Sequence, residues 1–475
     1  MAEARNTPTI AAAGYELPLM LLTGLIMAGC WALIPGALAG RAPEFSLLQL
    51  APGAWLLLCI DPLGVLFAAT IAPLWLLALI YSRGYLGAAH RERYYLVLML
   101  SLPLALGVAW AGNLLTLLVF YELLSVLAYL LVVHEETITA KAAAAKYIVY
   151  VLVGGSCILL GVVLVFHLVG GLGFAAGPML DAGLGRGYLT VIFVALLAGF
   201  GVKAALVPLH GWVPDAHPAA PAPFSALLSG ILVATGAFGI IRVTHQVFGV
   251  ELLRELGLMN WVAPLAAIGV LAAAVAAARQ DDLKRRLAYS TISQLGYITL
   301  AISLLGQELL VGALLHISNH AMMKATLFFC AGLLLRRAGV RRLSEMAGLA
   351  RRLPWTMAAF TLAALGMIGV PPLAGFISKW VLGMGTLEAG QPLYLLVFMG
   401  GSLLAAAYLL PVIYVAYFRE PEEGDGEGEE ISERGAGWML IPTLLAAAAT
   451  ILLGVAATTP GLPLSLARVA VAPFW

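Results

Sequence analysis

The protein has 475 residues, of which 62% are hydrophobic and only 11% are charged, and its formal net charge is +1. So few charges cannot cover the surface of a soluble chain of this length, and the composition therefore indicates a polytopic membrane protein. No basic patch with interleaved aromatic residues appears, so nucleic acid is not an expected partner.

Thirteen windows of the sequence are long and apolar enough to cross a bilayer, which takes about 20 helical residues. Their apolar runs are continuous and do not alternate, unlike the strands of a membrane barrel. We therefore predict an all-α polytopic membrane protein with about 13 transmembrane helices. The predicted spans are 17–39, 63–83, 94–112, 114–133, 144–169, 189–207, 222–244, 261–278, 285–305, 309–335, 355–382, 393–417 and 436–457.

Two segments between these windows differ from the rest. Residues 40–62 are broken by proline, so we expect a short extended or hairpin element against the outer face rather than a span. Residues 419–435, "REPEEGDGEGEEISERG", are acidic and glycine-rich, which predicts a cytoplasmic linker.

The basic residues of the predicted loops divide unevenly between the two sides of the membrane. With thirteen spans, 18 fall on the side of Arg5, five fall on the other side, and three lysines lie inside spans. The positive-inside rule then predicts a cytoplasmic N-terminus and an external C-terminus. The five residues of the smaller set are Arg41, Arg186, Arg242, Arg254 and Arg468.

The four cysteines are scattered singly, without a CxxC or other metal-ligand spacing. Neither zinc nor an iron–sulfur cluster is expected, and no nucleotide loop or flavin site appears. We therefore expect no cofactor and no catalytic site of the chain's own, so that any energy must come from a partner or an opposing ion gradient.

Four ionisable residues, Glu122, Lys203, Lys324 and Lys379, lie deep inside predicted spans. Each such charge costs roughly 2.5–3.5 kcal/mol even on the lenient insertion scale. In the simpler interpretation they pair with one another and fix helix packing, but buried ion pairs stabilise proteins weakly. One acid and three lysines spread along the chain favour an ion pathway instead.

Three of these spans carry a helix-interrupting or polar feature close to the charge. Pro208 follows Lys203, Pro371 and Pro372 precede Lys379, and the polar stretch "HISNHAMMK" precedes and includes Lys324. Helix breaks at membrane depth occur where the freed backbone lines a cavity or is covered by protein. Breaks in both halves of the chain are typical of inverted-repeat transporters.

Histidines extend this pattern. His316, His320 and Lys324 follow one another at i, i+4 spacing and therefore share one face of a helix. Each imidazole both accepts and donates a proton, so the stripe is suited to proton relay. Metal binding is the weaker interpretation, because no third ligand is near. His210 would lie at the break beyond Pro208.

Four motifs together resemble a known family: "KAALVPLHGWVPDAHPAAPAPFSALLSG" (203–230), "QDDLKRRLAYSTISQLGYI" (280–298), "NHAMMKATLFFCAG" (319–332) and "GVPPLAGFISKW" (369–380). They are similar to those of the antiporter-like subunits. This family comprises the large proton-pumping membrane subunits of respiratory complex I, Mrp antiporter subunits A and D, and their counterparts in group 4 hydrogenases. The resemblance covers about residues 55–457.

The resemblance implies ten core helices in two inverted five-helix repeats, with Lys203 and Lys379 on the broken helices. Glu122 matches the family's glutamate, and His320 and Lys324 match its central polar axis. Two features depart from the family pattern. Ala234 stands where many members have a lysine, which leaves the relay discontinuous unless water bridges it, and the first of the usual fourteen helices is missing.

We therefore expect a proton-translocating subunit of a multi-subunit membrane complex in a bacterial or archaeal cytoplasmic (inner) membrane, with proton/sodium exchange left open. Such a complex would be an ion-pumping oxidoreductase or a cation/proton antiporter, with other membrane subunits as partners. The alternatives are a self-sufficient secondary transporter for a small solute, a non-conducting structural subunit, and a proton channel subunit for inorganic carbon uptake. The expected parts are an N-terminal helix and extracytoplasmic loop (1–62), the antiporter-like core (63–417), the acidic loop (418–435) and a C-terminal helix and tail (436–475).

Overall fold

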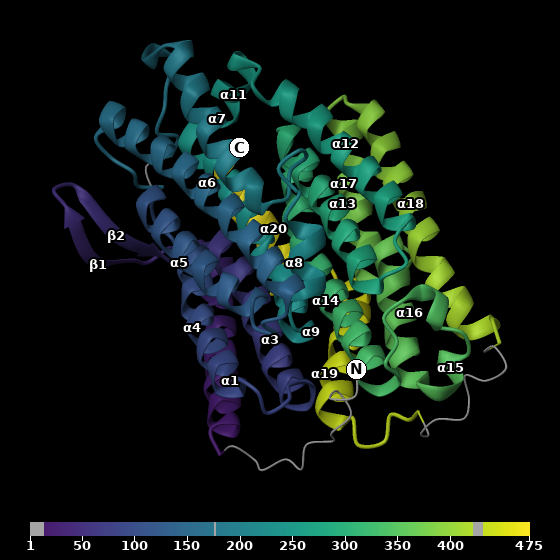
Figure 1. The fold of residues 1–475 in the computed structure, drawn as a ribbon. Helices are drawn as coiled ribbons and strands as arrows, with labels where there is room; N and C mark the ends of the chain where they lie inside the picture. The colour runs from purple at the N-terminus through teal and green to yellow at the C-terminus, as the bar shows by residue number, and fades with distance from the viewer. Residues whose placement is uncertain (1–13, 175–176, 421–430) are drawn as a thin grey trace.

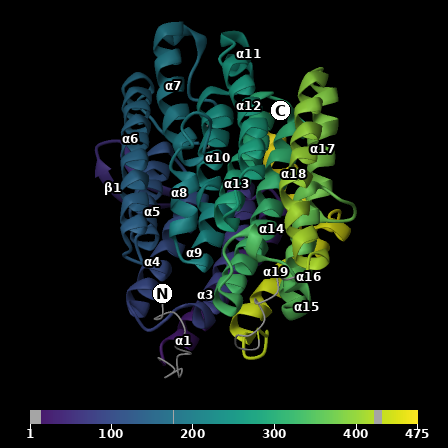
Figure 2. The same ribbon diagram turned by 45° about the vertical axis from the view of Figure 1, so that its right-hand side comes forward.

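The computed structural model describes residues 14–174, 177–420 and 431–475, and these form one bundle of long helices that run side by side (Figures 1 and 2). Arg5 and most of the acidic loop lie outside the described residues. Among the described residues, the only sheet is an antiparallel hairpin of β1 (Glu44–Ala51) and β2 (Ala54–Cys59).

The helices of the first half, in chain order, are α1 (Glu16–Ala32), α2 (Ile34–Leu38), α3 (Pro62–Tyr85), α4 (Arg91–Ala109), α5 (Leu114–Val132), α6 (Ile138–Val169), α7 (Arg186–Lys203), α8 (Val213–Ala219), α9 (Ala222–Leu227), α10 (Ala234–Arg242) and α11 (Val250–Leu256). Two π-helical stretches, η3 (Leu228–Leu232) and η4 (Val243–Phe248), continue α9 and α10. Those of the second half are α12 (Met259–Ala278), α13 (Leu283–Ser303), α14 (Gln307–Ala338), α15 (Leu349–Arg352), α16 (Pro354–Ile368), α17 (Ala374–Glu388), α18 (Pro392–Phe418), α19 (Gly437–Val455) and α20 (Pro463–Val471). Short 3₁₀ turns are η2 (Ala182–Leu184), η5 (Leu343–Glu345) and η6 (Ala472–Phe474).

The predicted class of helical membrane protein is confirmed. Ten helical segments in the described part of the chain are long and apolar enough to cross a membrane. The predicted spans 285–305 and 309–335 correspond to α13 and α14, which are not among those ten, and 355–382 is divided into α16 and α17. The count of 13 crossings and the repeat arrangement remain predictions.

Both predicted helix breaks at proline are present. Helix α7 ends at Lys203, and an irregular stretch containing Pro208 leads to α8. Helix α16 ends before Gly369, whose positive φ of +99° stops the helix, and α17 begins beyond the two prolines at Ala374.

The polar stretch "HISNHAMMK" does not interrupt its helix, and α14 continues through it without a break. The polar groups belong to side chains, and spacing them four residues apart leaves the backbone hydrogen bonds of the helix intact. These side chains are buried against α13 and α17, so they form a polar seam within a regular helix.

The predicted hairpin at 40–62 is confirmed, but it does not lie flat against the bundle. All eight residues of β1 are exposed, and the hairpin extends away from the helices (Figure 1). It is held at its β2 end, where the Leu57 amide donates to Thr116 Oγ1 (2.7 Å) and Asn113 Nδ2 donates to the Trp55 carbonyl (2.8 Å).

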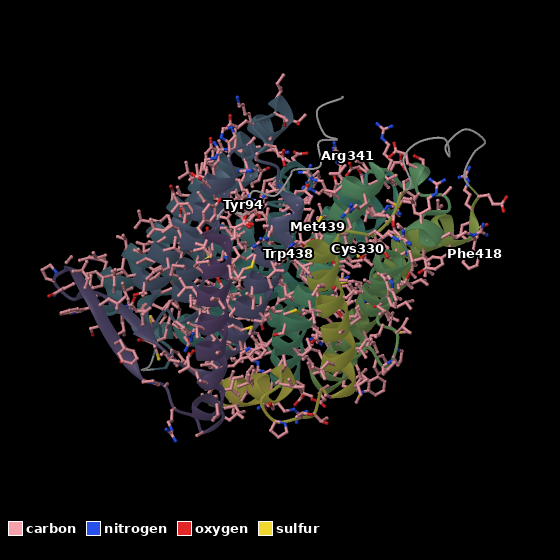
Figure 3. All side chains as sticks on the ribbon, turned by 90° about the horizontal axis from the view of Figure 1, so that it is seen from below. Tyr94, Cys330, Arg341, Phe418, Trp438 and Met439 are labelled. Atoms are coloured by element: carbon pink, nitrogen blue, oxygen red, sulfur yellow. The ribbon has the colours of Figure 1, made fainter. Side chains whose placement is uncertain are left out.

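We call one end of the bundle the basic face, and it is formed by the loops at residues 86–90, 133–137, 279–282 and 339–353. Contacts between Arg93 and His134, Ser344 and Asp281, and Arg336 and Tyr85 hold the loops and the adjoining helix ends together. Figure 3 views this end, with Arg341 and Trp438 labelled. Buried Glu16 pairs there with Arg83 and Arg91, and the Arg83 guanidinium stacks 4.4 Å over the Trp438 ring. These contacts join α1, α3, α4 and α19.

Arg242 does not lie in an external loop as predicted. The helical segment continues beyond the predicted end at residue 244 as η4, so the Arg242 side chain is fully buried. It donates to both carboxylate oxygens of Asp61, the N-cap residue of α3, and to Gln246 Oε1 (2.8 Å). The smaller set of loop charges therefore loses one of its five members.

Candidate functional site

The first charged group of the bundle lies between α5, α6 and α7. Lys203, the last residue of α7, is fully buried, and its Nζ donates to Ser125 Oγ (2.6 Å) and to the Tyr147 hydroxyl (3.2 Å). The ammonium also lies 5.1 Å from the centre of the Tyr121 ring. Hydroxyl oxygens and aromatic faces thus solvate this cation.

Glu122 lies one helical turn before Ser125 on α5 and is half-buried. Its carboxylate is more than 4.0 Å from Lys203 Nζ, so the predicted acid–lysine neighbours do not form a direct ion pair. The carboxyl group packs over Gly155 of α6, where an added Cβ would lie 2.4 Å from its Cδ. Glycine at this position makes room for the acid.

The second charged group is centred on α14 and α13. Lys324 is fully buried, and its Nζ donates to Ser290 Oγ (2.5 Å) and to the Leu287 carbonyl (2.9 Å). The Tyr408 hydroxyl of α18 donates to the same Ser290 oxygen (3.1 Å). Lys324, like Lys203, is solvated by neutral oxygens.

One and two turns earlier on α14, His320 and His316 are also fully buried, with ring centres 6.0 Å apart. His316 exchanges hydrogen bonds with Ser378 Oγ (2.9 Å, through Nδ1) and Gln294 Oε1 (3.0 Å, through Nε2). Neither ring nitrogen of His320 has a side-chain or backbone partner among the described residues. The predicted stripe therefore exists and reaches α17 through Ser378.

The third charged group is at the break between α16 and α17. Lys379 is half-buried and follows Ser378 directly, and its Nζ donates to the carbonyls of Met367 (2.7 Å) and Ile368 (3.1 Å), which end α16. It also donates to Ser402 Oγ (3.0 Å) on α18. The helix break supplies the carbonyl oxygens that this lysine needs.

The two halves are less directly joined. His210 is half-buried in the irregular stretch beyond Pro208, away from the α14 stripe. Ala234, where the family often has a lysine, is buried. Nearby in sequence, the hydroxyl groups of Ser229 and Thr291 hydrogen-bond at 2.7 Å and join η3 to α13. Among the described side chains, no direct hydrogen bond joins the Lys203 group to the Lys324 group.

Sequence reasoning found the charges but missed the hydroxyl and amide groups around them, which are Ser125, Tyr147, Ser290, Gln294, Ser378, Ser402 and Tyr408. Spacing provided a signal for two of them, since Ser125 is three residues from Glu122 on one helix and Ser378 adjoins Lys379. No group of three His, Cys, Asp or Glu residues in the described ranges is placed to hold a metal ion.

This arrangement of buried lysines, histidines and broken helices matches a known family model. The model of the transmembrane part of NADH:quinone oxidoreductase and Mrp antiporter proteins covers residues 111–405. The chain belongs to this family. The predicted antiporter-like membrane subunit is therefore confirmed, and Glu122 and the three buried lysines lie within the matched range.

Similar proteins include other antiporter-like subunits. The chain is 35% identical to NADH-quinone oxidoreductase subunit N of Desulforudis audaxviator, over 84% of this chain and 81% of that one. It is also 35% identical to hydrogenase-4 component B of Escherichia coli, over 64% of this chain, but it spans less than half (46%) of that longer relative.

The antiporter-like fold is also found in solved structures. A subunit of the membrane-bound sulfane sulfur reductase, an archaeal respiratory membrane complex, superimposes with a TM-score of 0.87 at 27% identity. The match covers 98% of this chain and 94% of that subunit. The fold of nearly the whole chain is therefore one already seen in a solved membrane complex.

Proposed function

We propose that this antiporter-like subunit moves protons across the membrane along its buried polar axis, within a complex of several membrane subunits. The proposed carriers are Glu122, Lys203, His210, His316, His320, Lys324 and Lys379. Sodium exchange through the same axis is the variant that the experiment below distinguishes.

The observation that supports this function is the environment of the three buried lysines. Among the described residues, none of Lys203, Lys324 and Lys379 has a carboxylate within 4.0 Å, and each donates to a serine hydroxyl. The other oxygens are the Tyr147 hydroxyl at Lys203 and backbone carbonyls at Lys324 and Lys379. A lysine fixed in a buried ion pair cannot lose its proton without leaving a buried, unpaired carboxylate. A lysine among neutral oxygens can be charged or neutral, as a carrier must be.

The second half provides most of a path. Lys324, His320 and His316 follow each other along α14. His316 hydrogen-bonds to Ser378, the residue before Lys379. Protein groups or single waters can pass a proton along such a series. Between the Lys203 and Lys324 groups, we propose that water molecules complete the path.

We further propose that the basic face is cytoplasmic. The N-terminus then lies on the cytoplasmic side of a bacterial or archaeal inner membrane. The excess of arginine and lysine at this face supports that orientation, even with Arg242 removed from the other side. The names of the relatives support partner subunits of the complex I, Mrp or hydrogenase type. The proposed core, 63–417, contains all the carriers.

The test uses the complex purified through a tag on this chain, and everted membrane vesicles from the same strains. E122Q, K203A and K379A are each compared with K141A, which removes an exposed lysine at the start of α6. Proton uptake is followed by acridine-dye quenching, driven by the electron donor of the assembled complex or by an imposed sodium gradient. We expect each axis variant to assemble but to lose most proton uptake, and K141A to behave as wild type.

Wild-type proton uptake in all three axis variants would contradict the proposal and favour the structural subunit. Loss of bicarbonate-dependent growth with proton uptake intact would favour the inorganic-carbon alternative. Sodium-driven uptake that disappears in the same variants would identify sodium as the exchanged ion.

A further inference from the structure

The structure contains a fully buried histidine outside the proposed axis. His217 lies on α8, between the Pro208 break and α9, and its side chain has no solvent exposure. No hydrogen bond of good geometry reaches either ring nitrogen among the described residues, and the Ser225 backbone is the polar group beside the ring. The ring lies between Trp212 (centroids 6.4 Å apart) and Phe328 of α14 (5.6 Å), roughly parallel to both.

An unpartnered imidazole is an unfavourable group to bury. Most buried side-chain nitrogens in proteins have a protein or water partner, and each exception calls for an explanation. A phenylalanine would fill the gap between two aromatic rings without unsatisfied nitrogens. Packing alone therefore does not account for a histidine here, whereas a transient proton or water partner does.

The charges around His217 suggest what it exchanges. Two lysines are placed close to the short helix of His217: Lys324 lies one turn before Phe328 on α14, and Lys284 lies in the first turn of α13, against the end of α8. Lys284 is 9% exposed, and its Nζ donates to the carbonyl of Ala220 (2.7 Å), the residue after α8. His217 thus lies between Lys284, at the basic face, and Lys324, in the proposed proton path.

The opposite side of α8 faces the basic-face surface. Asp215, two residues before His217, pairs with Lys146 (2.7 Å) and lies 3.7 Å from Arg285, and all three are partly exposed. Helix α8 packs against both α6 and α13 (Figure 1). These surface charges mark the point at which water meets the short helix that carries His217.

We propose that His217 is a proton carrier between Lys284 and Lys324, and that it forms an entrance from the basic face directly into the second half. One ring nitrogen accepts the proton that the Lys284 ammonium gives up, and the other nitrogen releases its proton towards neutral Lys324. The ring returns to its starting tautomer by rotation or through water. This route does not pass position 234, so alanine there does not interrupt it.

The inference rests on the proposed proton translocation and is tested in the same assembled complex and vesicles. H217F keeps an aromatic ring between Trp212 and Phe328 but cannot carry a proton, and H217Q keeps polarity without a titratable group. The matched control is H134F, because His134 is also buried on the basic-face side, also contacts an aromatic ring (Tyr94) and also has an unpartnered Nδ1.

We expect H217F and H217Q to assemble and to lose proton uptake by at least about tenfold, since a positioned proton-transfer group contributes about 10²–10⁴-fold. H134F should retain wild-type uptake. K284M should cause a similar loss, and the double variant H217F/K284M should lose no more than the worse single variant, as expected for one path.

K203A separates the two proposals. If K203A abolishes uptake while both His217 variants pump as wild type, His217 is a core residue and only the inference is overturned. If E122Q, K203A and K379A all pump normally, the proposed function itself fails. If H217F does not assemble, H217Q and K284M decide, and wild-type uptake in both overturns the inference.

Discussion

A lysine ammonium carries three N–H donors and no acceptor, so a buried lysine must be surrounded by oxygen atoms or lose its proton. At Lys203 these oxygens belong to Ser125 and Tyr147, while Glu122 lies one turn away beyond pairing distance. The side chain therefore has two candidate partners on α5: Ser125, which it contacts in this structure, and Glu122, one turn away. We infer that proton transfer uses both positions.

This inference predicts the effect of S125A. A hydrogen bond to a charged group contributes about 1.5–3 kcal/mol, so without the Ser125 hydroxyl the equilibrium of the ammonium should shift towards Glu122. Since about 1.4 kcal/mol corresponds to tenfold, we expect proton uptake to fall about tenfold or more in assembled complexes. The control is S156A, an exposed serine of α6 whose hydroxyl bonds only to its own helix. Unchanged uptake in S125A would show that the serine position is not used.

The sequence predicts the charged residues of the site better than their partners. A lysine or glutamate in an apolar run is visible because burial of a charge is costly. Serine, threonine and tyrosine are common in membrane helices, so Ser290 and Ser402 gave no comparable signal. The Asp61–Arg242 pair was missed for another reason. Arg242 lies two residues before the predicted end of its span and was counted with the loop, whereas the helical segment continues to Phe248.

The element that positions Lys379 is the broken helix α16–α17, and it depends on close backbone contacts. A Cβ at Gly375 of α17 would lie 1.9 Å from the Gly366 carbonyl oxygen of α16. A Cβ at Gly454 of α19 would lie 2.1 Å from the Pro372 carbonyl oxygen. Backbone atoms cannot turn aside as a flexible side chain can, so small residues at these positions are required for the break to pack.

We therefore predict that G375A destabilises the chain by about 1–3 kcal/mol, the usual cost of overpacking. Gly383 lies on the same helix, where a Cβ would meet only the flexible Leu395 side chain at 3.3 Å, so G383A is the matched control. Thermal unfolding of the detergent-solubilised complex, followed by tryptophan fluorescence, should show a lower Tm for G375A alone. Equal Tm values would mean that the break relaxes without cost.

Among the elements, proline was a reliable sequence signal and polarity was not. Both helix breaks at proline were predicted, because proline cannot donate a backbone hydrogen bond and clashes with the preceding turn. The polar run in α14 resembled a break but is regular helix. The π-helical stretches η3 and η4 were not predicted, because their sequences, LSGIL and VTHQVF, fall within or next to an apolar window that indicates only a helix.

At the scale of the whole molecule, the orientation in the membrane follows from where the charges lie. Ala88, between α3 and α4, and Ala182, in η2, are both exposed, and the three long helices α4, α5 and α6 separate them along the chain, so we expect them at opposite ends of the bundle. In a background without the four native cysteines, we expect a membrane-impermeant maleimide to label A182C in intact cells or spheroplasts. It should label A88C only in everted vesicles. The reverse labelling pattern would contradict the positive-inside orientation.

The surface of the hairpin bears on how the chain joins a larger assembly. Phe45 and Leu48 of β1 are more than half exposed, and the outer edge of β1 has no strand beside it. Open strand edges are not stable in lipid, and exposed apolar edges in water bind other chains. The hairpin is therefore the surface of this molecule best suited to hold a neighbouring subunit.

Replacing both side chains, in the variant F45S/L48S, should leave the chain in the membrane but weaken its hold on the partner. Full burial of a large apolar side chain contributes about 1.5–3 kcal/mol, so two of them correspond to a loss of at least about a hundredfold in affinity. Affinity purification through this chain should then recover less of the neighbouring subunits, whereas Q49S, on the same exposed strand, should recover them fully. If F45S/L48S recovers the wild-type set, the partner is held elsewhere, because no interface that buries these residues would tolerate their loss.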